Sequence, residues 1–389
     1  MPLPLLMLLV FGAAKLLAEL FEHLNLPGIV GEILAGVIIG PSLLGWVQPE
    51  GLVLSLADLG VMFLLFRVGL EIKSSELTKI GRTAALVAAG GVALSLLLAW
   101  GALALWGIHS IEAIFVSAAL AATSAGISAE VLSARGLLER RASRIVLAAA
   151  VIDDVCGLLV LSVVSGLSTG RVNYVAIGST VVFASAFVAI VARWGTKAMQ
   201  HLIPRVGGGM RLVEAEFALS ISLLFALSLF SVYTGIAAIV GAFLAGMALA
   251  ETVGTRVRTL VHGATELLVP FFLVGIGLRV NLSALRSPAM IALAATLLCA
   301  AIAGKVGGCG LGALPLGVPE ALRVGVGMIP RGEVTMVVAQ LGLTMGIIGH
   351  DVFGVVVLVA VASALAAPPL IGSAFRSRRP LPIESVPLN

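Results

Sequence analysis

Long apolar segments separated by short polar loops cover almost the whole chain. A helix that crosses a bilayer needs about 20 apolar residues, and the hydropathy pattern predicts about thirteen such spans. They cover residues 3–21, 28–45, 52–70, 83–106, 111–134, 143–168, 174–194, 214–233, 236–250, 264–278, 288–313, 320–345 and 353–374. Only helices and closed barrels satisfy their backbone in lipid, and no alternating barrel pattern is present. The sequence therefore predicts an all-α polytopic membrane protein.

The basic residues predict how these spans are oriented. Eighteen of the 24 Lys and Arg residues lie in or beside the loops and tail on one side. The opposite loops hold Arg171, Arg279 and Arg286, while Lys15, Lys305 and Arg331 lie within spans. Basic residues accumulate on the cytoplasmic side of a membrane. We therefore expect the N-terminus outside and the C-terminus inside.

The thirteen spans divide into six, one and six, and the two sets of six have opposite topology. Weak internal echoes support this division, the best being Val68-Gly69-Leu70 at the end of span 3 and Gly275-Ile276-Gly277-Leu278 at the end of span 10. Inverted repeats of this kind place ion sites near the bilayer midplane, on interrupted helices. The pattern thus predicts a six-plus-six inverted repeat.

Composition excludes several other classes of protein. The chain is 60% hydrophobic and only 11% charged, with mean hydropathy +1.15, whereas soluble domains are about 25% charged. The net charge of +4 fits basic loops beside acidic lipid rather than a nucleic-acid surface. The sequence contains no phosphate-binding loop, no Ser/His/Asp arrangement and no zinc-ligand spacing. We therefore expect neither an enzyme nor a resident cofactor.

Two adjacent acids interrupt the apolar stretch Val151–Leu161 of span 6. Charged groups at membrane depth are costly and usually functional, so Asp153 and Asp154 are the first candidate site. Adjacent helical side chains point about 100° apart, so one acid can pair with the deep Lys305 of span 11 while the other faces a water-filled cavity. The alternative is that both acids only hold the helices together.

Spans 5 and 12 carry polar interruptions at matched positions in the two halves. Span 5 contains Ala122-Thr123-Ser124-Ala125-Gly126-Ile127-Ser128, whose small and hydroxyl residues could either supply oxygen ligands at a break or only permit close packing. Span 12 contains Pro330-Arg331-Gly332-Glu333, where proline lacks an N–H and glycine is flexible, so this helix should break. Paired interruptions favour a transport site.

Other ionisable residues in the spans are expected to have structural roles. Lys15 and Glu19 are four residues apart in span 1 and are predicted to pair with each other. Glu32, Asp58 and Glu71 could line the mouth of a cavity or cap loops, and caps or interface roles are favoured.

Together these residues resemble bacterial Na+/H+ antiporters of the cation:proton antiporter superfamily, in particular the thirteen-helix Nap type. The similarity extends over essentially the whole chain. It rests on Ala122–Ile127, Val151–Val155, Gly304-Lys305 and Pro330–Val334. The resemblance implies that Asp154 is the main ion-binding acid and that Asp153 pairs with Lys305. It further implies that Thr123 and Ser124 line the Na+ site, with Asp154 and Thr123 as ligands, and that Arg331 and Glu333 support the crossing.

The resemblance also implies a homodimer built from two domains. Residues 1–82 and 214–287 would form the dimerisation domain, and residues 83–170 and 288–375 the core domain. Residues 171–213 would form a linker helix, and residues 376–389 a cytoplasmic tail.

The function expected from these features is secondary active exchange of Na+, and also Li+, for H+ by alternating access. Two protons per Na+ would make the exchange electrogenic and suit it to pH homeostasis. The Asp-Asp pair favours Na+ over K+, but a K+/H+ antiporter stays an alternative. An organic-anion symporter on the same general fold and a non-transporting membrane sensor or scaffold are less favoured. The expected partners are a monovalent cation, a proton, the lipid bilayer and a second copy of the chain, with no nucleic acid.

Overall fold

The computed structural model describes residues 2–376 except 25, 73, 109–110, 169–177, 179–181, 184–185, 208–214, 235–236 and 281–286. Throughout this part of the chain every regular element is helical, which confirms the predicted all-α fold. The elements are α1 (Leu3–His23), α2 (Gly28–Ile39), α3 (Leu52–Leu70), α4 (Ser74–Leu105), α5 (Ile111–Ala121), α6 (Ala125–Ala134), α7 (Arg141–Ser168), η1 (Val191–Gly195), α9 (Thr196–Gly207), α10 (Ala215–Tyr233), α11 (Ala238–Leu249), α12 (Thr255–Leu278), α13 (Pro288–Ala313), η3 (Leu314–Leu316), α14 (Val318–Gly327), α15 (Glu333–Thr344) and α16 (His350–Phe375).

Most predicted spans coincide with these helices, and three differ clearly at one end. Among the described residues, eight candidate spans are long and apolar enough to cross a membrane, while α2, α11 and the apolar part of α15 are shorter. Helix α4 begins at Ser74, earlier than the predicted residue 83. Helix α2 ends at Ile39 rather than at residue 45, since Gly40 adopts an extended conformation before Pro41. Helix α12 begins at Thr255, earlier than the predicted residue 264. Much of the seventh predicted span, and the tail beyond Arg376, lie outside the described residues.

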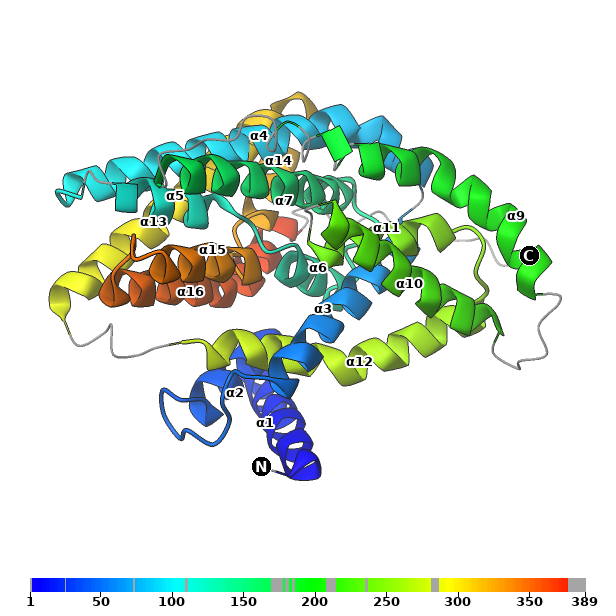
Figure 1. The fold of residues 1–389 in the computed structure, drawn as a ribbon, viewed down its shortest axis with the longest axis horizontal. Helices are drawn as coiled ribbons and strands as arrows, with labels where there is room; N and C mark the ends of the chain where they lie inside the picture. The colour runs from blue at the N-terminus through cyan, green and yellow to red at the C-terminus, as the bar shows by residue number, and fades with distance from the viewer. Residues whose placement is uncertain are drawn as a thin grey trace, which may run out of the picture.

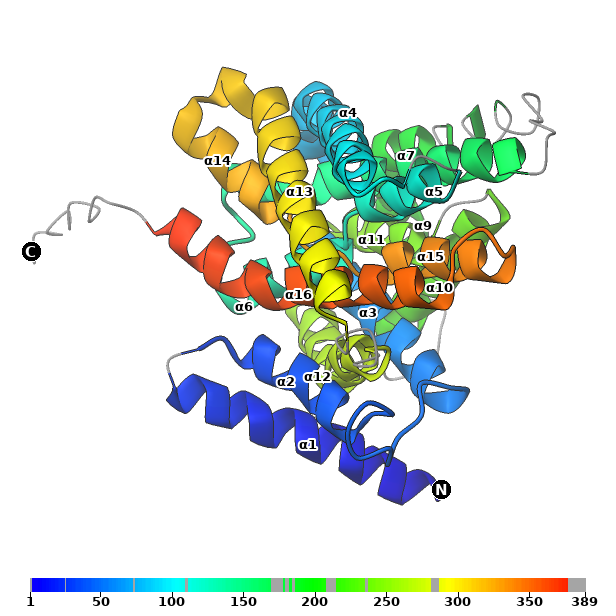
Figure 2. The ribbon, with the colours of Figure 1, turned by 90° about the vertical axis from the view of Figure 1, so that its left-hand side faces the viewer.

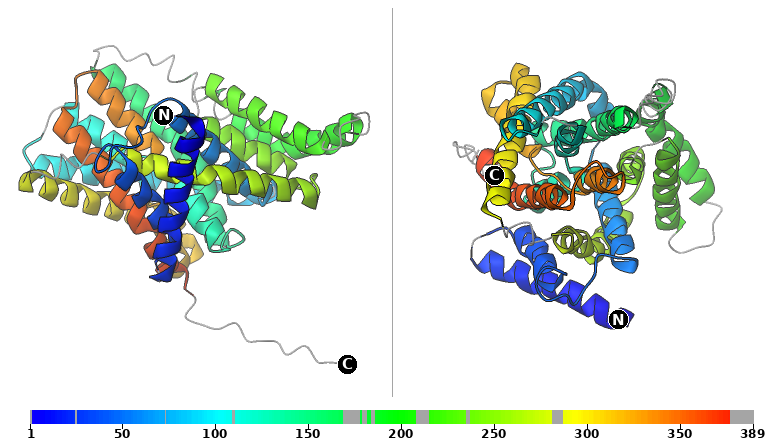
Figure 3. Two further views of the ribbon diagram at one scale, coloured as in Figure 1. Left: turned by 90° about the horizontal axis from the view of Figure 1, so that it is seen from below. Right: turned by 60° about the vertical axis from the view of Figure 1, so that its left-hand side comes forward.

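The helices pack in two groups. Helices α1, α2, α3, α10, α11 and α12 pack mainly on one another, and α4, α5, α7, α13, α14, α15 and α16 form the second group around the long α4–α13 contact (Figure 1). Figure 2 shows α1, α2 and α12 below the second group, and the right-hand view of Figure 3 again places α1 and α2 at an edge, away from α4 and α13. Helix α6 contacts α3 of the first group and α7 and α16 of the second.

Glycine contacts between helices repeat with the symmetry expected of an inverted repeat. A Cβ on Gly36 of α2 would lie 2.1 Å from the carbonyl oxygen of Val274 in α12, and one on Gly246 of α11 would lie 2.1 Å from that of Phe66 in α3. Spans 2 and 9 stand second in the two sets of six, and spans 3 and 10 stand third. Each contact therefore joins the second span of one half to the third span of the other, and the repeat relates the two contacts. Only glycine permits backbones to approach so closely. The weak sequence echoes therefore mark equivalent packing positions.

Candidate functional site

Spans 5 and 12 are both interrupted, and their interruptions touch. Helix α5 ends before residues 122–124 and α6 follows them, while residues 328–332 separate α14 from α15. The Ser124 amide donates to the Pro330 carbonyl oxygen at 2.8 Å. A Cβ on Gly332 would lie 2.7 Å from Ser124 Oγ. The predicted breaks are confirmed, and the alternative that span 5 is a continuous helix packed through small residues is wrong.

Side chains from the same segments satisfy the backbone groups that the breaks expose. Ser124 is the N-cap of α6, where its hydroxyl oxygen accepts from the Ile127 amide at 3.3 Å. The Ser128 hydroxyl donates to the Gly327 carbonyl oxygen at 2.8 Å, at the C-terminal end of α14. Buried polar groups without partners are costly. These bonds therefore explain how two broken helices are stable inside an apolar protein.

Arg331 is fully buried and holds three segments together. Its guanidinium donates to the Ala122 carbonyl oxygen at 2.9 Å and to the Ala301 carbonyl oxygen at 2.8 Å. Its main-chain amide donates to Ser363 Oγ at 3.0 Å. The positive charge thus lies at the C-terminal end of α5, where a helix dipole favours a cation. The supporting role predicted for Glu333 is not tested, because its side chain lies outside the described residues.

Asp153 is the acceptor at the centre of the crossing. Lys305 Nζ on α13 lies 2.8 Å from Asp153 Oδ1, and the Thr123 amide donates to Asp153 Oδ2 at 2.8 Å. Both charged side chains of this ion pair are fully buried. Charge-assisted hydrogen bonds of this length are strong. The predicted contact between Asp153 and Lys305 is therefore present, and it also fixes the broken segment of span 5.

Asp154 and Thr123 lie beside this ion pair with oxygen atoms suited to a cation. Asp154 is 4% exposed and Thr123 is 1% exposed. The Thr123 hydroxyl has no hydrogen-bond partner among the described residues. Carboxylate and hydroxyl oxygens suit hard cations. No group of three His, Cys, Asp or Glu side chains in the described part of the chain is arranged to hold a metal ion.

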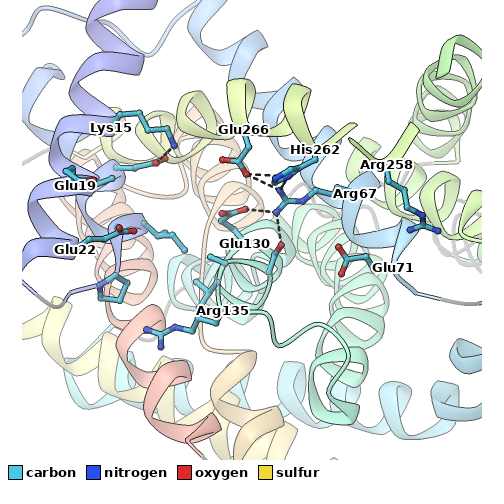
Figure 4. Close-up of a pocket in the computed structure, with 18 of the residues that line it drawn as sticks. Lys15, Glu19, Glu22, Arg67, Glu71, Glu130, Arg135, Arg258, His262 and Glu266 are labelled. Atoms are coloured by element: carbon cyan, nitrogen blue, oxygen red, sulfur yellow. Dashed lines mark hydrogen bonds and ion pairs between the residues drawn. The ribbon is translucent and has the colours of Figure 1, made fainter. Parts of the chain in front are cut away.

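A charged cavity lies at the ends of α3, α6 and α12, and its lining includes Glu32 and Glu71, for which the sequence left a position at a cavity mouth open. It has a volume of about 880 Å3, and Figure 4 shows Arg67 near its centre. Arg67 donates to Ser133 Oγ at 2.6 Å and to Glu266 Oε1 at 3.1 Å, and it lies 3.9 Å from Glu130 Oε2. Glu130 was the available signal, since it is a carboxylate within a predicted span.

The prediction that Lys15 pairs with Glu19 is wrong. Lys15 Nζ lies 2.8 Å from Glu32 Oε1 on the next helix, while Glu19 lies 3.1 Å from Nε2 of His23. Helices α1 and α2 approach closely, since a Cβ on Gly31 would lie 2.4 Å from the Leu17 carbonyl oxygen. This packing brings the buried Glu32 within reach of Lys15, which local spacing could not indicate.

Comparisons with known proteins agree with this architecture. The chain is 30% identical over 379 residues to the Na(+)/H(+)-K(+) antiporter GerN of Bacillus cereus, covering 95% of each protein. It is 32% identical over 421 residues to the high-affinity Na(+)/H(+) antiporter NhaS3 of Synechocystis sp., covering 96% of this chain and 90% of the relative. A solved structure of the sodium proton antiporter MjNhaP1 from Methanocaldococcus jannaschii has the same fold, with a TM-score of 0.72, 18% identity and 96% of each chain covered.

The model of the family described as sodium/hydrogen exchanger, transmembrane, matches residues 6–376. This match includes both interrupted spans, the acid pair and Lys305. Several relatives of the chain are named bacterial Na+/H+ antiporters, and the family is one of transporters. The chain therefore belongs to the sodium/hydrogen exchanger family.

Proposed function

We propose that this chain exchanges Na+ for H+ across a bacterial inner membrane, with Asp154 as the acid that binds the two ions in turn. The observation that carries the proposal is the crossing itself, where Asp154 and the unpartnered Thr123 hydroxyl lie in a buried position beside the Asp153–Lys305 ion pair. Na+ prefers oxygen ligands. Protons and Na+ compete for the same carboxylate, so protonation of Asp154 displaces Na+.

The Asp153–Lys305 pair supplies the second proton of the cycle. When Na+ binds, the Asp153 carboxylate interacts with the cation, and its ion pair with Lys305 breaks. A buried ammonium without a carboxylate is unstable, so Lys305 releases its proton. Two protons then move for each Na+, and the exchange responds to the membrane potential. Transport that is insensitive to the potential in proteoliposomes would contradict this stoichiometry.

The two packing groups supply the moving parts. The group that contains α4, α5, α7 and α13–α16 holds Asp153, Asp154 and Lys305, and it acts as the core that carries the ion. The group of α1–α3 and α10–α12 is the fixed domain through which two copies form a dimer. The apolar side chains of Leu8 and Leu16 on α1 are 69% and 73% exposed, as an outer helix of such a domain requires.

K+/H+ exchange is the second candidate, because the relative GerN is named a Na(+)/H(+)-K(+) antiporter. Li+ is expected to follow Na+, since both are small hard cations. A site with two Asp carboxylates can bind either Na+ or K+, so an experiment in which the two cations compete distinguishes Na+/H+ from K+/H+ exchange.

The decisive experiment measures proton flux in proteoliposomes driven by Na+, Li+ or K+. We expect Na+ and Li+ to drive flux in the unmodified chain, and Asp154→Asn to abolish it. Ser373→Ala, an exposed position at the end of α16, serves as the matched control and should transport normally. Full transport by Asp154→Asn would refute the assignment of Asp154 as the ion-binding acid. Proton flux driven by K+ alone would show that the exchanged cation is K+ rather than Na+.

A further inference from the structure

Two cavities lie at opposite ends of the same pair of helices, α3 and α12. One has a volume of about 600 Å3 and is lined by Asp58 and Val61 of α3 and by Phe272 of α12. It also reaches Gly157 of α7, one helical turn beyond Asp154. The other is the charged cavity of about 880 Å3 around Arg67, which includes Glu130 and Val131 of α6. Neither cavity is lined by Asp153, Asp154 or a residue of the crossing. We call them the Gly157 cavity and the Arg67 cavity.

An apolar contact separates the site from the Arg67 cavity. A Cβ on Gly126, at the start of α6, would lie 2.7 Å from Val61 Cγ2 and 2.8 Å from Phe272 Cζ. Val61 and Phe272 also line the Gly157 cavity. At Gly126, two residues after Ser124, helix α6 therefore lies directly against these two side chains of α3 and α12.

A polar contact lies between the same helices, on the side of the apolar contact that faces the Arg67 cavity. Arg67 of α3 binds Ser133 on α6 at 2.6 Å and lies 3.9 Å from the carboxylate of Glu130. On the other side it binds Glu266 at 3.1 Å and lies 2.9 Å from His262 Nδ1, both on α12 (Figure 4). The side chains of Arg67 and Glu130 are only 12% and 14% exposed. This ion pair is therefore screened less by water than a surface pair.

We infer that these two layers, Gly126 against Val61 and Phe272, and Arg67 against Ser133 and Glu130, form a closed gate between the ion site and the Arg67 cavity. In this state the layers close the site from the Arg67 cavity, while the Gly157 cavity reaches to within one helical turn of Asp154. The basic residues assign the Arg67 cavity to the cytoplasmic side, so the structure is the outward-facing state. Separation of α6 from α3 and α12 opens the site to the cytoplasm. The inference rests on alternating access by the proposed antiporter.

A labelling experiment tests the gate without measuring transport. A Cβ on Gly157 has only Val334 Cγ1 nearby, at 4.0 Å, so a cysteine fits at this position. Gly157→Cys is introduced after the three native cysteines, Cys156, Cys299 and Cys309, are replaced by alanine. A membrane-impermeant maleimide is applied to right-side-out or inside-out vesicles. We expect labelling from the outer face and little from the cytoplasmic face.

Two variants open the gate by different means. Gly126→Ala adds a methyl group into the apolar layer, and Arg67→Gln removes the charge from the polar layer. Each should raise labelling from the cytoplasmic face several-fold. Gly101→Ala, with no atom within 4 Å of its Cβ, controls for a glycine substitution. Arg258→Gln controls for an arginine in the same cavity, since Arg258 donates to the carbonyl oxygens of Leu70 and Ala250 rather than to α6.

The outcomes separate the gate from the transport function. Preferential labelling of the Gly157→Cys protein from the cytoplasmic face would overturn the inference. It would also be overturned if neither Gly126→Ala nor Arg67→Gln raised cytoplasmic labelling above that of the two control variants. If Gly126→Ala fails to fold, Arg67→Gln alone decides. If the protein is labelled as expected but exchanges no Na+, the proposed Na+ exchange is contradicted, whereas the inference of a closed gate is not.

Discussion

The buried ion pair between Lys305 and Asp153 allows a sharp test of how the crossing is stabilised. Lys305→Met leaves the Asp153 carboxylate buried with only the Thr123 amide as donor, and Asp153→Asn leaves the Lys305 ammonium buried without a carboxylate. The double variant removes both charges. We expect each single variant to be less stable than the double variant.

The magnitudes follow from the burial of the pair. Both side chains are fully buried and their atoms are 2.8 Å apart. Removing one partner of such a pair costs about 3–5 kcal/mol, because an uncompensated charge stays in a low-dielectric site. Removing both charges loses the Lys305–Asp153 hydrogen bond, with a net value of about 1 kcal/mol, while the amide oxygen introduced by Asp153→Asn still accepts from the Thr123 amide. The double variant should therefore lose about 1 kcal/mol, less than either single change.

The assay is the free energy of unfolding at neutral pH in mixed detergent micelles, titrated with SDS and followed by circular dichroism. Lys15 and Glu32 provide a matched control pair, since their atoms are also 2.8 Å apart but the Lys15 side chain is 41% exposed. Coupling there should not exceed about 1 kcal/mol. A Lys305–Asp153 double variant less stable than both singles, with additive losses, would refute the reasoning.

Three further changes test the packing around the site by the same unfolding measurement. Arg331→Lys should cost about 1.5–3 kcal/mol, because a lysine cannot reach both main-chain carbonyls that the guanidinium binds; no loss would mean that one of those bonds is dispensable. Ser363→Ala should cost about 1–3 kcal/mol, since it leaves the buried Arg331 amide without an acceptor, whereas the exposed Ser373→Ala should change stability by less than about 0.5 kcal/mol. Gly277→Ala should cost about 1–3 kcal/mol, because its Cβ would lie 2.0 Å from a carbonyl oxygen of α2, while Gly263→Ala on the same helix meets nothing within 4 Å and should stabilise it by about 0.5–1 kcal/mol.

Several features of the site were predictable because a charge or a helix break in an apolar segment is costly. Asp153 and Lys305 each lie in an apolar span, and pairing them is the simplest way to reduce that cost. Pro330 removes a helical hydrogen bond, so the break before α15 follows from the residue itself. The residue types alone do not decide whether the helix breaks at Thr123, because small residues also occur in continuous helices that pack closely.

Other contacts depend on which helices meet, and local spacing carries no information about that. Lys15 has Glu19 one turn away, yet it binds Glu32 because the close approach of α1 and α2 places that buried carboxylate nearby. In the sequence, Arg67 is only one of the basic residues near the end of a span. The fold places it between α6 and α12.

The sequence by itself determined the membrane class, the helical fold and the residue types at the crossing, because hydrophobicity and the cost of buried charge act residue by residue. Tertiary structure alone decided the partners. It placed the Thr123 amide on Asp153, the Arg331 guanidinium on the carbonyls of Ala122 and Ala301, and Gly126 against Val61 and Phe272. These contacts join residues far apart in the chain, and only the packing of whole helices brings such groups within hydrogen-bond or van der Waals distance.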